Sequence, residues 1–237
     1  MPFALQGSKA DALPASAPHE SSSLDRELTA GVHALGLAID SEQQARLIAF
    51  VALLGKWNKT YNLTAIREPA RMITHHLLDV LAVLPHLPRQ AGLRLLDVGS
   101  GGGVPGIPLA IARPDWRVVL VDSSHKKATF ARQAAIELKL ANVDAQATRI
   151  EDHAPDVHYD VVISRAFSDL ATFAALAEQH LAPNGLLVAM KGVHPDEELA
   201  ELPSVFAVVG SPALKIPGID AARHLIIMQR ASEVALG

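Results

Sequence analysis

The pattern of hydrophobic and polar positions changes at about residue 92. Before that point, apolar residues recur every three or four positions, which is the period of an amphipathic helix. After it, short apolar runs alternate with amphipathic stretches, a pattern typical of β-α-β units and a parallel sheet. The chain is therefore predicted to have a helical region over residues 24–92 and an α/β domain over residues 93–237.

Three helices are predicted in the N-terminal region. A weak helical spacing covers Asp25–Leu35, although Gly31 interrupts it. In the second helix Ser41 is the expected N-cap and Gly55 is the expected end. The third helix is expected over residues 69–84, because apolar side chains share one face there and prolines follow.

Seven strands are predicted in the second part of the chain. They are the apolar runs 93–98, 118–121, 143–147, 161–164, 186–190, 205–209 and 225–228. The turn Pro183–Gly185 precedes the fifth run, and the last two runs are spaced as a hairpin-like pair. We expect a seven-stranded, mostly parallel sheet with an antiparallel strand in its last pair.

Composition narrows the class of protein. The 237 residues are 49% hydrophobic and 19% charged, so the chain can bury a full core. Residues 1–23 are rich in Ala, Ser and Pro and are expected to form a disordered tail. The absence of cysteine excludes disulfides, Cys zinc sites and a cysteine nucleophile. No apolar run reaches ~18 residues and the N-terminus does not resemble a secretory signal, so a cytoplasmic enzyme or binding protein is expected.

A glycine-rich segment follows the first predicted strand and precedes a helix. Gly101, Gly103 and Gly106 fit the fingerprint of dinucleotide-binding loops, which is weak evidence alone. The spacing Asp97-x-Gly99-x-Gly101-x-Gly103 instead resembles the first motif of class I S-adenosylmethionine methyltransferases. Asp97 suits the ammonium group of that ligand and would repel a pyrophosphate, so the second frame is favoured.

Two further positions indicate a nucleoside ligand. Asp122 ends the second predicted strand, where a carboxylate can accept both ribose hydroxyls, although capping the next helix is the alternative. The turn at Arg149–Asp152 follows the third strand and is expected to face adenine. There the Ile150 side chain and nearby backbone groups would surround the base, unless this is an ordinary polar turn.

Several separated blocks make a narrower resemblance specific. They are Trp57–Thr64, His75–Asp79, Asp97–Pro108, Ile163–Ala166, Lys191–Gly192 and Arg223–Leu225. In these blocks the chain resembles the RsmG family, formerly called GidB, whose members are 16S ribosomal RNA guanine-N7 methyltransferases. The resemblance covers roughly residues 40–230.

The resemblance implies a fold, a donor and a substrate. The fold is a Rossmann-like class I methyltransferase domain with an N-terminal helical annex, and the donor is S-adenosylmethionine. The substrate is N7 of guanine 527 in 16S rRNA of the small ribosomal subunit. The family's cofactor contacts carry over to Gly99, Val104, Asp122, Ile150, Glu151 and Arg165, and the motif adds Asp97 and Gly101. Ala222 stands before Arg223 where the family commonly has an acidic residue, so no detailed role is assigned to Arg223.

The chemistry of that reaction agrees with the residues. Guanine N7 carries a free lone pair, so an in-line methyl transfer needs alignment and exclusion of water, without a base or covalent intermediate. No catalytic residue is identified, and the candidates for positioning the substrate are Arg165, Lys191 and Asn62. Arg165 could instead contact the cofactor or form a structural ion pair, Lys191 could be a surface lysine, and Asn62 could structure its loop.

Binding RNA requires local positive charge, because the net charge of the chain is -4. The candidate RNA-binding residues are Lys56, Lys59, Arg67, Arg71, Lys126 and Lys127. Trp57 lies among them and is expected to pack between the helical region and the sheet rather than to stack on a base. We expect a monomer that does not contact membranes.

The adjacent His75 and His76 invite a metal interpretation. On a helix they point about 100° apart, which makes sharing one ion difficult. His76 falls on the apolar face and is interpreted as a core or interface residue, which Asp79 is placed to orient. The remaining alternatives are a class I methyltransferase for another RNA or small molecule, a dinucleotide-binding oxidoreductase, and a ribosome-assembly factor without activity.

Overall fold

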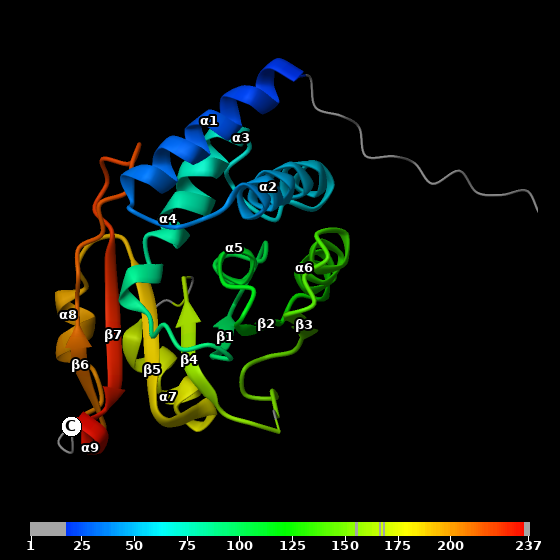
Figure 1. Cartoon of the computed structure of the whole chain (residues 1–237). Coiled ribbons are helices and arrows are strands. Elements are labelled where there is room, and N and C mark those ends of the chain that lie inside the picture. The colour runs from blue at the N-terminus through cyan, green and yellow to red at the C-terminus, as the bar shows by residue number, and fades with distance from the viewer. Residues whose placement is uncertain (1–17, 155, 166, 168, 235–237) are drawn as a thin grey trace, which may run out of the picture.

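The computed structural model describes residues 18–234 except 155, 166 and 168. Over those residues, seven strands form a single twisted sheet at the centre of the molecule (Figure 1). The strands are β1 (Arg94–Val98), β2 (Arg117–Asp122), β3 (Val143–Ala147), β4 (Tyr159–Ser164), β5 (Leu181–Lys191), β6 (Phe206–Gly210) and β7 (His224–Arg230).

The order of the strands is β3-β2-β1-β4-β5-β7-β6. β1 pairs in parallel with β2 and β4, and the parallel arrangement continues to β3 and β5. β7 runs antiparallel to both β5 and β6. This confirms the predicted seven-stranded, mostly parallel sheet. All the parallel strands place their carboxyl ends at the same edge, where ligands bind in open α/β sheets.

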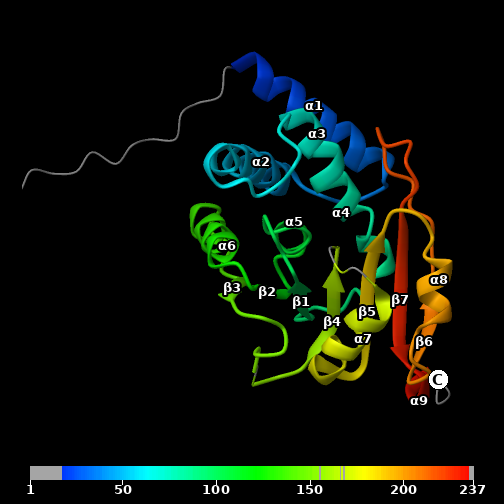
Figure 2. The ribbon, with the colours of Figure 1, turned by 180° about the vertical axis from the view of Figure 1, so that it is seen from behind.

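Helices cover both faces of the sheet (Figures 1 and 2). The helices and helical turns of the N-terminal region are α1 (Pro18–Ala34), α2 (Ser41–Tyr61), α3 (Pro69–Met72), the π-helical turn η1 (Ile73–Leu78), α4 (Asp79–Leu81) and the 3-10 turn η2 (Leu84–His86). Those that follow are α5 (Gly106–Ala112), α6 (His125–Glu137), α7 (Leu170–Ala177), η3 (Glu178–His180), α8 (Asp196–Ala200) and α9 (Ala231–Val234). None of the helices in the described part of the chain is long and apolar enough to cross a membrane.

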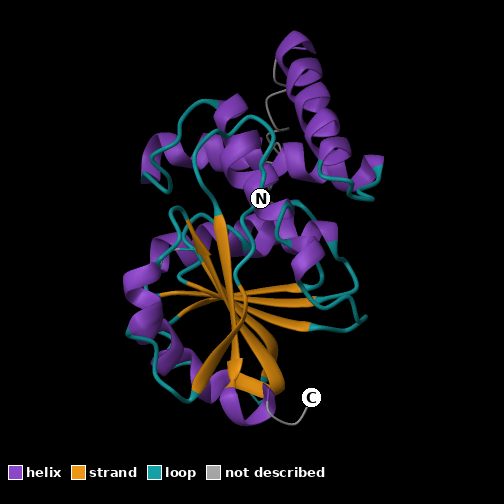
Figure 3. Cartoon of the chain, turned by 90° about the vertical axis from the view of Figure 1, so that its left-hand side faces the viewer, coloured by secondary structure: helices purple, strands orange, loops and turns teal. Residues whose placement is uncertain are grey.

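The alternation of side chains along the strands divides the core in two. Leu95 and Val161 belong to a cluster that includes α1, α2, α5 and α6, whereas Leu96 and Val162 belong to a cluster with α7. Strand residues alternate between faces, so neighbouring apolar residues serve different layers. Phe50 of α2 lies within the first cluster, so the expected division at about residue 92 separates two parts of one hydrophobic core. Figure 3 shows the N-terminal helices stacked above the sheet layer.

Helix boundaries differ from several expectations. α1 begins at Pro18, so residues 18–23 are helical rather than part of a tail, and the rest of that predicted tail lies outside the described residues. Gly31 does not interrupt α1, and a Cβ there would overlap the side chain of Leu78, so this glycine permits close packing against η1. The third predicted helix forms, but its centre is the π-helical turn.

The second helix starts and ends at other signals than predicted. Its N-cap is Asp40, whose Oδ1 accepts a hydrogen bond from the Gln43 amide at 2.8 Å. The Gln43 side chain returns to the Asp40 amide at 2.9 Å, which completes a capping box one residue before the expected one. The helix passes Gly55 and ends at Asn62, whose φ of 50° is the left-handed C-cap conformation.

The fifth strand is longer than predicted. The expected turn Pro183–Gly185 lies inside β5, where Asn184 has a φ of 57°. The pairing of β4 with β5 is irregular between Tyr159 and Val161, next to this position. The turn signal therefore marks an irregularity within the strand rather than its beginning.

Candidate functional site

The glycine-rich segment forms a tight loop at the carboxyl end of β1. Gly99, Gly101 and Gly103 have φ values of 71°, 56° and 75°, a region that residues with a Cβ rarely adopt. The amides of Gly99 and Ser100 donate to the carbonyl of Val121 in β2 at 2.9 and 3.2 Å. Glycine is favoured at these positions because the backbone turns sharply after β1, beside β2, and the turn uses positive φ values.

Asp97 holds this loop from behind. Its Oδ2 accepts a hydrogen bond from the Gly106 amide at 2.8 Å, at the start of α5. The side chain is fully buried, and burial raises the pKa of its carboxyl to about 7. A Cβ on Gly106 would lie 2.8 Å from the same oxygen, so glycine permits this contact. Asp97 therefore does not line the cavity as the ammonium contact would require, and we infer that it organises the loop instead.

Asp122 lies on the other side of the loop, at the end of β2. Its Oδ2 accepts from the Gly101 amide at 2.9 Å, and its Oδ1 accepts from the Ser124 amide at 2.8 Å. The ammonium group of Lys127 is 3.8 Å from Oδ2. Asp122 therefore attaches the glycine loop and forms a turn just before α6, whose N-cap is Ser124, so the predicted helix cap is not formed by Asp122.

A cavity of about 200 Å³, which we call the loop cavity, opens above the glycines. Its lining residues are Leu54, Leu63, Thr64, His76, Gly99, Ser100, Gly101, Gly102, Val104, Lys127 and Arg165. No atom would lie within 4 Å of a Cβ on Gly99, and only the Gly99 carbonyl would do so for Gly101. The backbone of both glycines is therefore open to a ligand in this cavity.

A second cavity of about 360 Å³, which we call the acceptor cavity, adjoins the first. It is lined by Ile66, His75, His76, Asp79, Arg165, Met190, Lys191, Gly192, Leu214, Arg223 and His224. Arg165 and His76 line both cavities and so form a wall between them. Three side chains of the acceptor cavity carry permanent positive charge and one is a carboxylate, which favours an anionic or electron-rich ligand.

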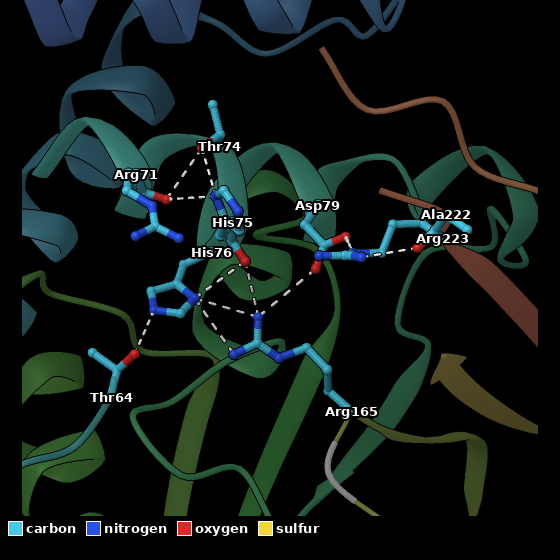
Figure 4. Close-up of polar contacts among 9 residues, drawn as sticks. All are labelled: Thr64, Arg71, Thr74, His75, His76, Asp79, Arg165, Ala222 and Arg223. Carbon is cyan, nitrogen blue, oxygen red and sulfur yellow. Dashed lines mark hydrogen bonds and ion pairs between the residues drawn. The ribbon is translucent and has the colours of Figure 1, made fainter. Parts of the chain in front are cut away.

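Arg165 follows β4 and reaches the N-terminal helices (Figure 4). Its guanidinium donates to the carbonyl of His75 at 3.0 Å and lies 3.3 Å from His76 Nδ1. Its nearest carboxylate oxygen on Asp79 is 3.9 Å away. The predicted structural ion pair is therefore present, and the side chain also faces both cavities; a ligand contact of Arg165 remains a prediction.

The buried His76 is neutral. Burial and the neighbouring Arg165 lower the pKa of its imidazole to about 4. Nδ1 lies 3.1 Å from the His75 carbonyl and 3.3 Å from the Arg165 guanidinium, and Nε2 lies 2.9 Å from Thr64 Oγ1, so the ring is held on both sides. This confirms the interface interpretation of His76. Asp79 does not orient it as expected, since its carboxylate contacts Arg165 and Arg223 instead.

Asn58 is a structural residue that sequence reasoning missed. Its buried side chain accepts from the Thr64 amide at 2.9 Å and donates to the Ile66 carbonyl at 3.3 Å. It thereby closes the loop 62–66 over the end of α2, and Thr64 then reaches His76. The sequence does carry a signal for this role: Asn58 interrupts the apolar face of the helix just before a loop, and a buried polar side chain there must find hydrogen-bond partners.

Lys191 lies in an ion pair rather than free at the surface. Its ammonium group is 2.7 Å from Glu198 Oε2, on α8, and its side chain is only 13% exposed. Glu198 also accepts from the Leu170 amide at 2.8 Å, which joins α8 to the start of α7. Lys191 still lines the acceptor cavity, but the surface-lysine alternative is wrong.

Other predicted site residues do not line the two cavities. Asn62 is exposed at the C-cap of α2, which favours its structural alternative. Ile150 is buried in the core cluster that contains α7, so little of its side chain is exposed for contact with an adenine ring. Glu151 is exposed in the following turn. Cofactor contacts of Ile150 and Glu151 therefore remain predictions.

The basic candidates belong to the N-terminal helical region and to α6. The exposed ones are Lys56, Lys59, Arg67, Arg71 and Lys126. Lys127 is half-buried and reaches the loop cavity. Trp57 packs against Phe130 of α6, with ring centroids 5.5 Å apart, which confirms its predicted place between the helical region and the sheet domain.

A seven-stranded sheet with a glycine loop after its first strand defines the class I methyltransferase fold, and solved structures share it. A SAM dependent methyltransferase from Aquifex aeolicus aligns with a TM-score of 0.55 and 17% identity, over 74% of this chain and 98% of that chain. One from Thiobacillus denitrificans, in complex with S-adenosyl-L-homocysteine, aligns with a TM-score of 0.51 and 15% identity, over 75% and 96%. Residues 43–226 match the GidB family, described as rRNA small subunit methyltransferase G, and the chain belongs to this family.

Close relatives carry the same description. Ribosomal RNA small subunit methyltransferase G from Laribacter hongkongensis is 52% identical over 203 residues, which are 86% of this chain and 97% of that protein. The protein of the same name from Azoarcus sp. is 54% identical over 203 residues, covering 86% and 95%. Family membership confirms the sequence-based resemblance and favours the methyltransferase frame of the glycine loop over the dinucleotide frame.

Proposed function

We propose that the protein transfers the methyl group of S-adenosylmethionine to N7 of guanine 527 in 16S rRNA of the small ribosomal subunit. The observation that carries the proposal is the acceptor cavity directly beside the loop cavity, in a chain of the rRNA small subunit methyltransferase G family. One chain lines both cavities, so we expect the monomer to be active. The substrate places the protein in the cytoplasm.

The loop cavity fits the donor. The open backbone at Gly99 and Gly101 and the adjoining Val104 would hold its methionine part. Asp122 is buried and does not line this cavity, so it would bind the ribose only by giving up its hydrogen bond to the Gly101 amide. S-adenosylmethionine supplies a methyl group already activated by its sulfonium. Ile150 and Glu151 are proposed as adenine contacts because they occupy the positions that bind it in the family.

The residues of this chain align the acceptor and exclude water. Guanine N7 is a hydrogen-bond acceptor with a free lone pair, so no side chain has to remove a proton. His76, whose pKa is lowered to about 4, is a poor base near neutral pH, which agrees with a reaction that needs none. Arg165, at the wall between the cavities, is placed to donate to the guanine or its phosphate while N7 stays free. Leu54 and Leu63 cover the glycine loop and keep water away.

The surface outside the cavities supports an RNA partner. Lys56, Lys59, Arg67 and Arg71 belong to the N-terminal helical region, and Lys126 lies on α6 beside the loop cavity. Such exposed cations bind phosphates without reading sequence, so binding should weaken as salt rises. The selection of one guanine would then depend on the shape of the assembled subunit and on the acceptor cavity.

The test is methyl transfer from labelled S-adenosylmethionine to purified small subunits of a strain lacking the enzyme, followed by mapping of the modified base. We expect label at N7 of one guanine. Arg165→Ala should lower the rate at least tenfold, whereas Arg113→Ala, a change in an ion pair with Asp115, should not. Absence of label, with S-adenosylhomocysteine still bound, would refute the substrate and keep the fold.

A further inference from the structure

The π-helical turn η1 frees one backbone carbonyl for use outside the helix. In a regular α-helix the Asp79 amide would donate to the His75 carbonyl, four residues earlier. Here the Asp79 amide donates to the Thr74 carbonyl instead. The His75 carbonyl accepts from Arg165 at 3.0 Å, from a strand end ninety residues further along the chain. Single π-helical turns are rare and often lie at functional sites.

Asp79 is the charged partner that follows this turn. Its side chain is only 6% exposed, and its Oδ1 accepts from Arg223 Nε at 3.2 Å. Its Oδ2 lies 3.9 Å from the Arg165 guanidinium. Burial raises the pKa of this carboxyl above its usual value, and the two arginines oppose that effect only in part. One buried carboxylate thus faces two guanidinium groups from different parts of the sheet domain (Figure 4).

Both arginines remain partly open to the acceptor cavity. Their side chains are 29% and 24% exposed, for Arg165 and Arg223 respectively, and both line the cavity. Arg223 also donates to the Ala222 carbonyl at 2.8 Å, so both sides of its guanidinium are engaged in fixing its direction. A flexible arginine loses much rotamer freedom when it binds a ligand, and a fixed one has less to lose.

We propose that Asp79 is a positioning residue for the RNA acceptor, which holds Arg165 and Arg223 together at the wall of the acceptor cavity. It acts through the two guanidinium groups and does not touch the reacting atoms. Two donor-rich groups held side by side suit the oxygens of a nucleotide, either guanine O6 or a phosphate. The inference rests on the proposed function, because it deepens the role of the same cavity.

The experiment compares Asp79→Asn with the wild type in four measurements. They are methyl transfer to small subunits, binding of small subunits, binding of S-adenosylhomocysteine by calorimetry, and the melting temperature. We expect kcat/KM to fall about tenfold or more, mainly through a higher KM, because a charge-assisted contact is lost. Subunit binding should weaken by a similar factor, whereas binding of S-adenosylhomocysteine should stay within about twofold.

A double-mutant cycle separates positioning from a general structural role. If Asp79 acts through its arginines, Asp79→Asn should cost clearly less in an Arg223→Ala background than in the wild type. Asp160→Asn is the matched control, since it removes a carboxylate that pairs with Arg94 at the amino end of β4, far from the cavity. It should leave kcat/KM unchanged.

Each outcome decides one claim. The positioning role would be overturned if Asp79→Asn kept the wild-type KM and subunit binding. It would also be overturned if the variant lost affinity for subunits and for S-adenosylhomocysteine by the same factor, or if the effects of the two substitutions in the cycle simply multiplied. If Asp79→Asn does not fold, Arg223→Ala alone must raise KM about tenfold, and an unchanged KM would refute the inference. If even the wild type transfers no methyl group, the proposed function fails, and subunit binding by the variants still decides whether Asp79 positions the arginines for RNA.

Discussion

Replacing Asp97 with asparagine should change the pH dependence of stability in a calculable way. The carboxyl is fully buried, Oδ2 accepts from Gly106, and Oδ1 has no hydrogen-bond partner within the described residues. Burial raises the pKa from 3.8 to about 7, and the Gly106 hydrogen bond and Arg165 only partly oppose the shift. The folded protein therefore binds a proton at pH 5 that the unfolded chain has released.

The sign and size follow from linkage. Because the pKa of Asp97 is raised in the folded state, proton binding by this carboxyl stabilises the fold. That contribution is fully present below the unfolded pKa near 4 and is lost as pH rises through 7. A shift of roughly three units at 1.36 kcal/mol each amounts to about 4 kcal/mol. The asparagine of the variant has no such titration, but its amide leaves a buried donor unpaired at a cost of about 1–3 kcal/mol.

Asp97→Asn should consequently be less stable than the wild type at pH 5 and as stable or more stable at pH 8. Urea denaturation followed by circular dichroism at several pH values between 5 and 8 measures the difference in free energy of unfolding. Only the part of the titration above pH 5 falls in this range, about two pH units, so we expect this difference to shift toward the variant by about 2–3 kcal/mol. A difference that stays constant with pH would refute the assignment of this titration to Asp97.

Three further changes test the loop and its support. Gly103→Ala should lower the free energy of unfolding, measured by urea denaturation, by about 1–3 kcal/mol more than Gly92→Ala. Both glycines have a φ of 75°, but only at Gly103 would an added Cβ overlap a side chain, that of Ile107. Equal losses of stability would contradict this. Asp122→Ala should weaken S-adenosylhomocysteine about 10–100-fold in calorimetry, since two backbone amides and the proposed ribose contact lose their acceptor; unchanged affinity would place the cofactor elsewhere. Trp57→Ala should lower the free energy of unfolding by about 2–4 kcal/mol, because the indole packs between α2 and α6; loss of RNA binding at unchanged stability would instead favour base stacking.

The central strands of the sheet were predictable because they are buried on both faces, unlike the edge strands β3 and β6. Continuous apolar runs such as Leu225–Met228 then identify a strand within a residue or two. Helix ends were less predictable, because they depend on which of several polar residues adopts the capping conformation. Asp40 and Ser41 are both good N-caps, and only the reciprocal bond with Gln43 decides between them. Gly55 likewise resembled an end although the left-handed residue is Asn62.

The glycines of the candidate site were predictable from local spacing, and its ionic contacts were not. Gly99 and Gly101 lie in one short motif, whose conformation follows from their backbone freedom. Asp79 and Arg223 are 144 residues apart, and their contact exists only because the fold brings the start of α4 beside the residue that precedes β7. Lys191 was predicted to end the fifth strand, as it does, but its partner Glu198 belongs to a short helix that the apolar pattern did not indicate.

The wall formed by Arg165 and His76 has a thermodynamic consequence. Because the same two side chains face both cavities, a ligand in one cavity that shifts them also changes the affinity of the other cavity. Such coupling is reciprocal: the factor by which the donor changes RNA affinity must equal the factor by which RNA changes donor affinity. Methyl transfer converts a cationic donor into a neutral by-product, so the charge felt by Arg165 changes at the moment of reaction. In the proposed function, the affinity of the methylated RNA therefore depends on whether the neighbouring cavity still holds the by-product, and the by-product's affinity depends on the RNA by the same factor.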